Sequence, residues 1–232
     1  MKNIKAVFTK QILSFFKNPA MIGTPVAFLL IPFAILILVP GAYEDIDIIT
    51  AQFVVMFVGI SMIGASAGLI AEDRLTMNLR FMGMAGVKPY QYLISMCATL
   101  LLISFGALIL FGLIGRHSSE VMPNFLIISM LGATCSMLLG ITLSLSKFAP
   151  FAPIIGILLG VGPIFSDANE FLANIFHFVY THQVNITIRG DMIENFEEAV
   201  QIISINIAVL LLAFIFTNTR YGLDGEKLAK SS

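Results

Sequence analysis

Few residues of this chain could do catalytic chemistry, and their spacing does not favour it. Ser66 lies among small residues, Gly64-Ala65-Ser66-Ala67, as the nucleophile of an intramembrane serine protease would. Such a serine needs a histidine at the same depth, yet all three histidines fall between apolar runs: His117, His177 and His182. The acids Glu197 and Glu198 have no histidine pair nearby to complete a metal site. We therefore expect no catalytic residues and no metal site, and interpret Ser66 as a helix-packing residue.

The sequence also indicates that any energy source lies outside this chain. It contains no Gly-x-x-x-x-Gly-Lys-Ser/Thr phosphate loop, so P-loop hydrolysis of ATP is not expected of it. Proton- or sodium-coupled carriers need ionisable groups at membrane depth to bind the coupling ion. The cores of the apolar runs contain no Asp, Glu, Lys, Arg or His. An ion-coupled carrier is therefore disfavoured.

The chain contains six long apolar runs, spread along its length. Hydrophobic residues make up 58% of the sequence and charged residues 12%, and the mean hydropathy is +0.94. A helix needs about 20 residues to cross a hydrocarbon core of about 30 Å, and five of the runs reach roughly that length. The approximate runs are 21–40, 52–70, 90–114, 124–145, 150–165 and 200–216. The fold class predicted is an all-α membrane protein with six transmembrane helices over 19–218.

The lysines and arginines predict the orientation. Only Arg116 and Arg189, of 13 lysines and arginines, lie on the side opposite the termini. Because cytoplasmic loops carry the excess of positive charge, both termini are expected in the cytoplasm. The predicted location is the plasma membrane of a bacterium. Segment 219–232 is expected to be a short cytoplasmic tail.

The segment before the first span, 1–18, has a helical pattern of apolar residues with lysines on other faces. It predicts an amphipathic helix lying on the cytoplasmic leaflet; a disordered basic anchor is the alternative. The residues assigned to the membrane interface are Lys5, Phe8, Ile12, Phe15 and Phe16.

A charged island, about 72–82, separates the second and third runs. Leu75, Leu79 and Met82 would share one face of a short amphipathic helix, with Arg74 and Arg80 elsewhere on the wheel. Such a helix on the cytoplasmic side is suited to docking another protein. An ordinary solvated loop is the alternative.

The run AEDRLTMNLRFMGMAGVKPYQYLISM, from Ala71 onward, resembles the cytoplasmic segment of type-2 ABC transporter permeases. The matching positions are Glu72, Thr76, Leu79, Arg80, Pro89 and Tyr90. Leu75 departs from that pattern, in which glycine usually precedes the threonine. The layout is also similar: an N-terminal amphipathic helix, six spans and a longer outside segment, here about 167–199.

This resemblance implies a role for the island and a set of partners. The island would be a coupling helix that docks a nucleotide-binding ATPase subunit, which would bind the ATP and Mg; this chain would bind no cofactor. The coupling residues are then Glu72, Asp73, Arg74, Leu75, Thr76, Leu79, Arg80 and Met82. A second permease chain, identical or paralogous, would pair through the first and fifth spans, with Gly156 and Gly160 as the expected dimer contact.

The function expected is that of the permease subunit of an ATP-driven exporter. It would move an amphipathic or hydrophobic substrate, such as a drug, peptide or lipid, out of the cell by alternating access. A channel-like or carrier-type transporter without an ATPase is the alternative. The sequence leaves open whether segment 167–199 dips into the outer leaflet or forms a lid.

Overall fold

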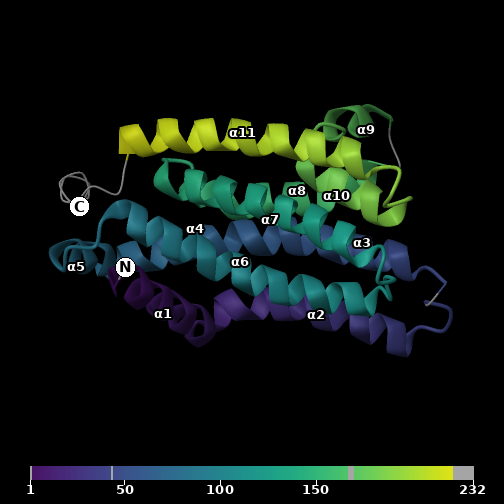
Figure 1. Cartoon of the computed structure of the whole chain (residues 1–232), viewed down its shortest axis with the longest axis horizontal. Coiled ribbons are helices and arrows are strands. Elements are labelled where there is room, and N and C mark those ends of the chain that lie inside the picture. The colour runs from purple at the N-terminus through teal and green to yellow at the C-terminus, as the bar shows by residue number, and fades with distance from the viewer. Residues whose placement is uncertain (1, 43, 167–169, 222–232) are drawn as a thin grey trace.

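The structure, a computed structural model, describes residues 2–42, 44–166 and 170–221, and every regular element in them is a helix (Figure 1). Among these residues, six helices are long and apolar enough to cross a membrane by length and composition. The predicted all-helical architecture with six candidate spans is therefore confirmed. Most of the tail predicted over 219–232 lies outside the described residues.

Each predicted apolar run corresponds to one span. The first span is α2 (Pro19–Leu38). The second is continuous through α3 (Ile46–Met56), η1 (Phe57–Ser61) and α4 (Met62–Leu75), and the fifth joins η2 (Ala149–Phe151) to α8 (Ala152–Ser166). The third, fourth and sixth are α6 (Pro89–Ile114), α7 (Met122–Leu145) and α11 (Phe196–Tyr221). The second span extends beyond the predicted 52–70. Hydropathy marks only the apolar middle of a helix, and the backbone hydrogen bonds continue into the charged residues at both ends.

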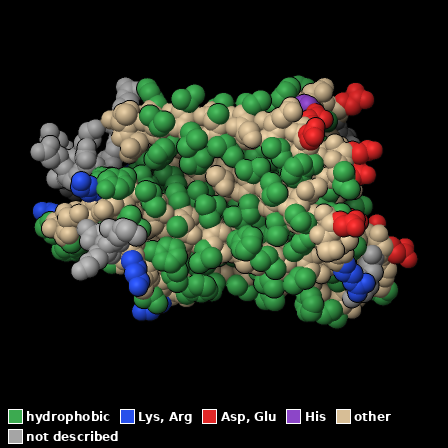
Figure 2. Space-filling view, in the orientation of Figure 1, with side chains coloured by type: hydrophobic (Ala, Val, Ile, Leu, Met, Phe, Trp, Pro, Cys, Tyr) green, Lys and Arg blue, Asp and Glu red, His purple; other side chains and the backbone are tan. Residues whose placement is uncertain are grey.

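The shorter helices gather at the two ends of the bundle. The start of α1 (Lys2–Lys17), the end of α11 and the helix α5 (Asn78–Met84) lie at one end, which we call the α5 end (Figure 1). The helices α9 (Glu170–Phe176) and α10 (Tyr180–Arg189) lie at the other, the α10 end. In Figure 2 the acidic side chains gather at the α10 end, and an apolar surface separates them from lysines and arginines at the α5 end.

The predicted helix over 72–82 is interrupted. α4 continues to Leu75, and Met77 then takes a left-handed backbone conformation with φ of 57°. The Thr76 hydroxyl donates to the Glu72 carbonyl at 2.7 Å, in the last turn of α4. A non-glycine residue at positive φ ends a helix, so α5 starts as a separate element at Asn78. The island is thus the last turn of the second span followed by a two-turn helix.

The second span contains one turn of π-helix, η1, near its middle. Gly59 in this turn lies so close to α8 that a Cβ atom there would be 2.6 Å from the Gly160 Cα. Only glycine permits such a close approach of two backbones. The second and fifth spans are therefore joined backbone to backbone at this point.

Candidate functional site

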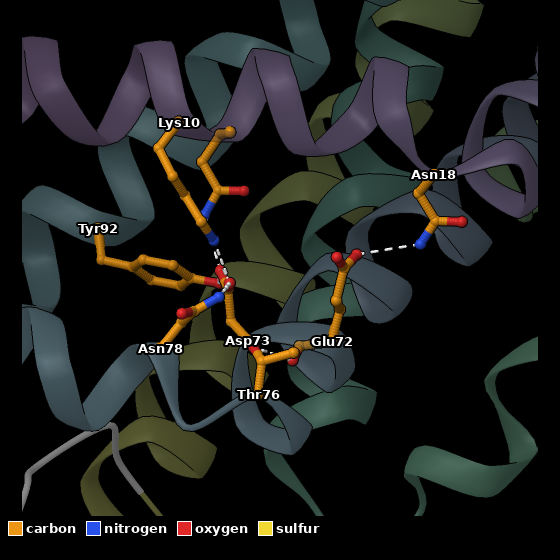
Figure 3. A network of polar contacts seen from close by, with 8 residues as sticks. Lys10, Asn18, Glu72, Asp73, Thr76, Asn78 and Tyr92 are labelled. Carbon is orange, nitrogen blue, oxygen red and sulfur yellow. Dashed lines mark hydrogen bonds and ion pairs between the residues drawn. The ribbon is translucent and has the colours of Figure 1, made fainter.

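The most developed polar arrangement in the structure surrounds Asp73, close to the α5 end of α4. Its side chain is buried, with 1% of the residue exposed. Asp73 Oδ2 accepts hydrogen bonds from Gln11 Nε2 at 2.9 Å and from the Tyr92 hydroxyl at 3.0 Å. Asp73 Oδ1 pairs with Lys10 Nζ and accepts from Asn78 Nδ2 at 3.2 Å. One carboxylate thus joins α1, α4, α5 and α6 (Figure 3).

The partners reach Asp73 because α1 packs against α6. Val7, Gln11 and Phe15 are spaced four residues apart and form the buried face of α1. Beside this face, the Ser95 hydroxyl of α6 donates to the Ile4 carbonyl at 3.1 Å. Lys10 is next to Gln11 and keeps 32% of its side chain exposed. Its ammonium group can therefore reach the carboxylate from the edge of the buried face of α1.

A buried carboxylate is stabilised only when opposite charge and hydrogen bonds replace its hydration. Asp73 has both, with one ammonium group and three neutral donors. Losing any donor would leave a charge without full compensation in a region of low dielectric. The arrangement therefore fixes the relative positions of the four helices that it joins.

The two neighbours of Asp73 point elsewhere. Glu72 is half-buried, and its Oε2 accepts from Asn18 Nδ2 at 3.0 Å, at the junction of α1 and α2. Arg74 is half-buried, and its Nη1 donates to the Ser144 carbonyl of α7 at 2.8 Å. Three consecutive charged residues thus connect the end of α4 to three different neighbours.

The residues assigned to coupling divide into buried and exposed groups. Asp73 is buried, and Glu72, Arg74, Leu79 and Met82 are partly buried. The other three are exposed: Leu75, Thr76 and Arg80. Large apolar side chains that the sequence assignment omitted are exposed beside them, with Met77 51%, Phe81 60% and Met84 68% exposed. We call Leu75, Met77, Arg80, Phe81 and Met84 the α5 surface.

The sequence assignment also missed the partners of Asp73. Glu72 and Asp73 are adjacent acids, and the local sequence does not indicate which of them is buried. Adjacent residues on a helix point about 100° apart, so only one of the two can face a given neighbour. The available signal was Gln11, a polar residue in line with Val7 and Phe15 on the apolar stripe of the N-terminal segment.

The residues assigned to the membrane interface are spread around α1. Phe15 is buried against the bundle, while Phe8 and Ile12 are half-buried. Lys5 and Phe16 are exposed, and 57% of Phe16 is accessible. The helix itself is present, and its contact with lipid remains a prediction.

The two glycines expected at a dimer contact pack inside this chain, and their role in pairing stays a prediction. Gly156 and Gly160 are both buried within this chain. A Cβ atom at Gly156 would lie 3.4 Å from the Gly59 carbonyl oxygen, and one at Gly160 would lie 2.7 Å from Ile60 Cγ1. Their face of α8 is filled by the second span. The exposed side chains of α8 lie on other faces: Ile154, Ile157, Leu158 and Phe165.

The α10 end buries a second polar region, within segment 167–199. Although α10 is rich in polar residues, nearly all of it is buried between α3, α7, α8 and α11. The Tyr180 hydroxyl and the Ser136 hydroxyl are 2.7 Å apart, and burial raises the pKa of Tyr180. Ser166 Oγ lies 3.2 Å from His182 Nδ1. α10 is therefore an internal helix of the bundle and not an exposed lid.

Several oxygen atoms of this region have no hydrogen-bond partner in the structure. They belong to Thr50 and Ser129 on neighbouring spans and to Thr181 and Asn185 on α10. His117 Nε2 is also buried without a partner. Burial lowers the pKa of His117, and the charge of Asp47 opposes this shift.

Two other chemical candidates are placed by the structure. The Ser66 hydroxyl is buried against Gly140 of α7 and donates to the carbonyls of Met62 at 2.9 Å and Ile63 at 3.1 Å. Ser66 thus lies at a helix crossing. Within the described part of the chain, no three His, Cys, Asp or Glu side chains are grouped to hold a metal ion.

Comparison with known proteins found no matching family model, curated protein or solved structure. The resemblance to type-2 ABC permeases therefore rests on the motif around Glu72 and on the six-span layout.

Proposed function

We propose that this chain is the membrane-spanning permease subunit of an ABC exporter, and that the α5 surface docks a cytoplasmic ATPase subunit. The observation that carries the proposal is a group of exposed apolar side chains at the end of the second span and on α5, with Leu75 85% and Met84 68% exposed. Arg80, Phe81 and Met84 are all exposed on α5, and arginine, phenylalanine and methionine are enriched at protein contact surfaces.

The Asp73 arrangement supports this role. A docking surface can transmit movement only if it is held firmly to the spans. Through Asp73, the start of α5 is tied to α1 and α6, and through Arg74 the end of α4 is tied to α7. Movement of the docked subunit would therefore displace several spans together, as alternating access requires.

The distribution of charge supports a cytoplasmic α5 end in a plasma membrane. Among the described residues, most lysines and arginines lie at the α5 end, whereas Arg116 and Arg189 lie at the α10 end beside many acids. The ATP and Mg would be bound by the partner subunit. A second permease chain would complete the transporter, with amphipathic or hydrophobic molecules as its cargo.

The docking role is tested by charge reversal at Arg80. Arg80→Glu should abolish co-purification of the ATPase and its stimulation by this chain, because removing one partner of an interfacial charge pair costs about 2–5 kcal/mol. Lys147→Glu is the matched control, since it also reverses a positive charge on an exposed residue, in the connection between α7 and η2 and outside the α5 surface. Both variants should insert and unfold like the original chain.

The opposite result would disprove docking through α5. If Arg80→Glu retained full ATPase stimulation, the ATPase would have to bind elsewhere. Transport by the purified chain with no ATPase present would favour a channel-like or carrier-type transporter instead.

A further inference from the structure

A groove of about 570 Å³ lies between α2 and α8, over the second span. It extends from Glu72 at the α5 end to Ile60 and Ser61 near the middle of that span. Met21 on α2 and Ile157 on α8 contribute apolar sides. We call it the α2–α8 groove. Its volume is within the range typical of small-molecule sites.

The floor of the groove is hollowed by glycine. A Cβ atom at Gly64 would have no atom within 4 Å, and one at Gly68 would meet only the tip of Met21 at 3.4 Å. Gly64 is exposed to the groove and not packed against a neighbouring helix. The space over it is long enough and apolar enough for a hydrocarbon chain.

Ser61 provides an independent sign of a ligand. The residue is 2% exposed, it lines the groove, and its hydroxyl has no hydrogen-bond partner in the structure. Two other buried serines of the spans, Ser66 and Ser104, donate to carbonyls of their own helices. Ser129 of α7 is also without a partner, but it does not line the groove. A buried hydroxyl without a partner carries a desolvation cost that a polar group of a ligand would remove.

Glu72 provides the charge. One oxygen of its carboxylate accepts from Asn18, and among the described residues no lysine, arginine or histidine forms an ion pair with it. Glu72 is eleven positions after Ser61 on the second span, which is a rise of about 16 Å along the helix. The groove thus has a negative charge at one end, an apolar middle, and a neutral polar group at the other end.

We propose that the α2–α8 groove binds a cationic amphiphile, whose positive head group pairs with Glu72 while its hydrocarbon part lies over Gly64 and Gly68. A molecule with a hydroxyl or carbonyl group at the far end would also meet Ser61. This inference names a substrate class for the proposed exporter and rests on that function only for the step of transport. Binding itself requires no ATPase.

The test measures binding of two fluorescent probes to the full chain in phosphatidylcholine nanodiscs, with empty nanodiscs subtracted. The probes are a dansyl-labelled dodecyl trimethylammonium and the dodecyl sulfonate of the same length and label. The original chain should bind the ammonium probe at least tenfold more tightly than the sulfonate. Glu72→Gln, which can still accept from Asn18, should remove this preference.

The shape of the groove is tested with a matched pair of glycine variants. Gly64→Leu should lower affinity for the ammonium probe at least tenfold, because its side chain occupies the groove. Gly106→Leu should not, since Gly106 is also exposed with no atom within 4 Å of a Cβ but lies on α6, away from the groove. Ser61→Ala should weaken binding of a probe with a terminal hydroxyl and leave the plain alkyl probe unaffected.

Three results would overturn the inference: equal affinity for the two probes, an unchanged preference in Glu72→Gln, or unchanged binding in Gly64→Leu. If Gly64→Leu lowered self-association and left probe binding intact, the groove would be a contact for a second copy of the chain. If Gly64→Leu failed to fold, the Glu72→Gln result would decide alone. Failure of the ATPase to co-purify would refute the proposed function and leave the binding result unaffected.

Discussion

At the α5 end a single carboxylate, Asp73, accepts from four donors, whereas at the α10 end a largely polar helix is buried with two of its side-chain oxygen atoms unpartnered. The difference follows from charge. An ionised group in a medium of low dielectric must be compensated by its neighbours, while a neutral hydroxyl can be left without a partner at a cost of about 1–3 kcal/mol. The α5 end therefore has one main centre, Asp73, beside the single contacts of Glu72 and Arg74, whereas the α10 end is held by several weaker contacts.

The largest effect is expected from Asp73→Ala. Removing one partner of a buried ion pair costs about 3–5 kcal/mol, because the groups left behind lose their compensation. The free energy of unfolding, measured by denaturant titration in a fixed detergent, should fall by about that amount. Glu120→Ala, a change to an exposed acid at the opposite end, should alter it by less than about 0.5 kcal/mol.

Equal and small losses in both variants would show that Asp73 is not the centre that holds the α5 end. Asp73→Asn should lie between the two, because an amide retains some hydrogen bonds but loses the charge of the pair with Lys10.

Two variants at the α10 end, with opposite expected effects on the free energy of unfolding, test this contrast. Thr181→Val removes a buried hydroxyl that has no partner, at nearly constant volume, and should raise the free energy of unfolding by about 1 kcal/mol. Ser136→Ala removes a hydroxyl hydrogen-bonded to Tyr180 and should lower it by about 1 kcal/mol. The same unfolding titration measures both.

A loss of stability in Thr181→Val as large as in Ser136→Ala would contradict the comparison. It would mean that the Thr181 hydroxyl is compensated by water within the bundle, as buried polar groups often are.

The smallest effect is a pH dependence from His117. Because burial lowers its pKa in the folded state below the ordinary 6.5, the unfolded chain binds more protons between the two values. Stability contributed by neutral His117 is therefore present above about pH 6.5 and is lost as the pH falls below it. His117→Gln should flatten the decline in melting temperature between about pH 7 and pH 5.

His177→Gln is the control for this measurement, because the His177 side chain is 45% exposed. If the two variants showed the same pH profile, the burial of His117 would have no part in it.

The spans themselves were predictable from hydropathy, since each needs only a run of apolar residues of sufficient length. The burial and hydrogen-bond partners of Glu72 and Asp73 were not predictable in this way. Both are acids at the end of one helix, but the crossing of α1 over α6 places Gln11 and Tyr92 beside Asp73. Glu72 instead accepts a hydrogen bond from Asn18. Local pattern also favoured one helix through Met77, whose left-handed backbone has no signal in the sequence.

The burial of α10 was also not predictable from the local sequence. Thr181, Gln183 and Asn185 are residues that usually face water, so the pattern indicated an outside segment without deciding its depth. Its burial depends on contacts with α3, α7, α8 and α11, which are distant in sequence. Likewise, Gly156 and Gly160 were recognisable as a close-packing pair, but their partner was Gly59 of the same chain.

The π-turn over Phe57–Ser61 bears on how sequences related to this chain should be aligned. A turn closed by i→i+5 hydrogen bonds contains one residue more than a turn of α-helix. The residue numbering of the second half of the span is therefore shifted by one position relative to a continuous α-helix. A relative with one residue fewer between Met56 and Met62 could close that turn as ordinary α-helix. It would still present Asp73 to α1 and Val54 to the core. A single-residue gap at this point would therefore mark a straightened span with the same neighbours, whereas a gap elsewhere in the span would rotate one half by about 100° against the other.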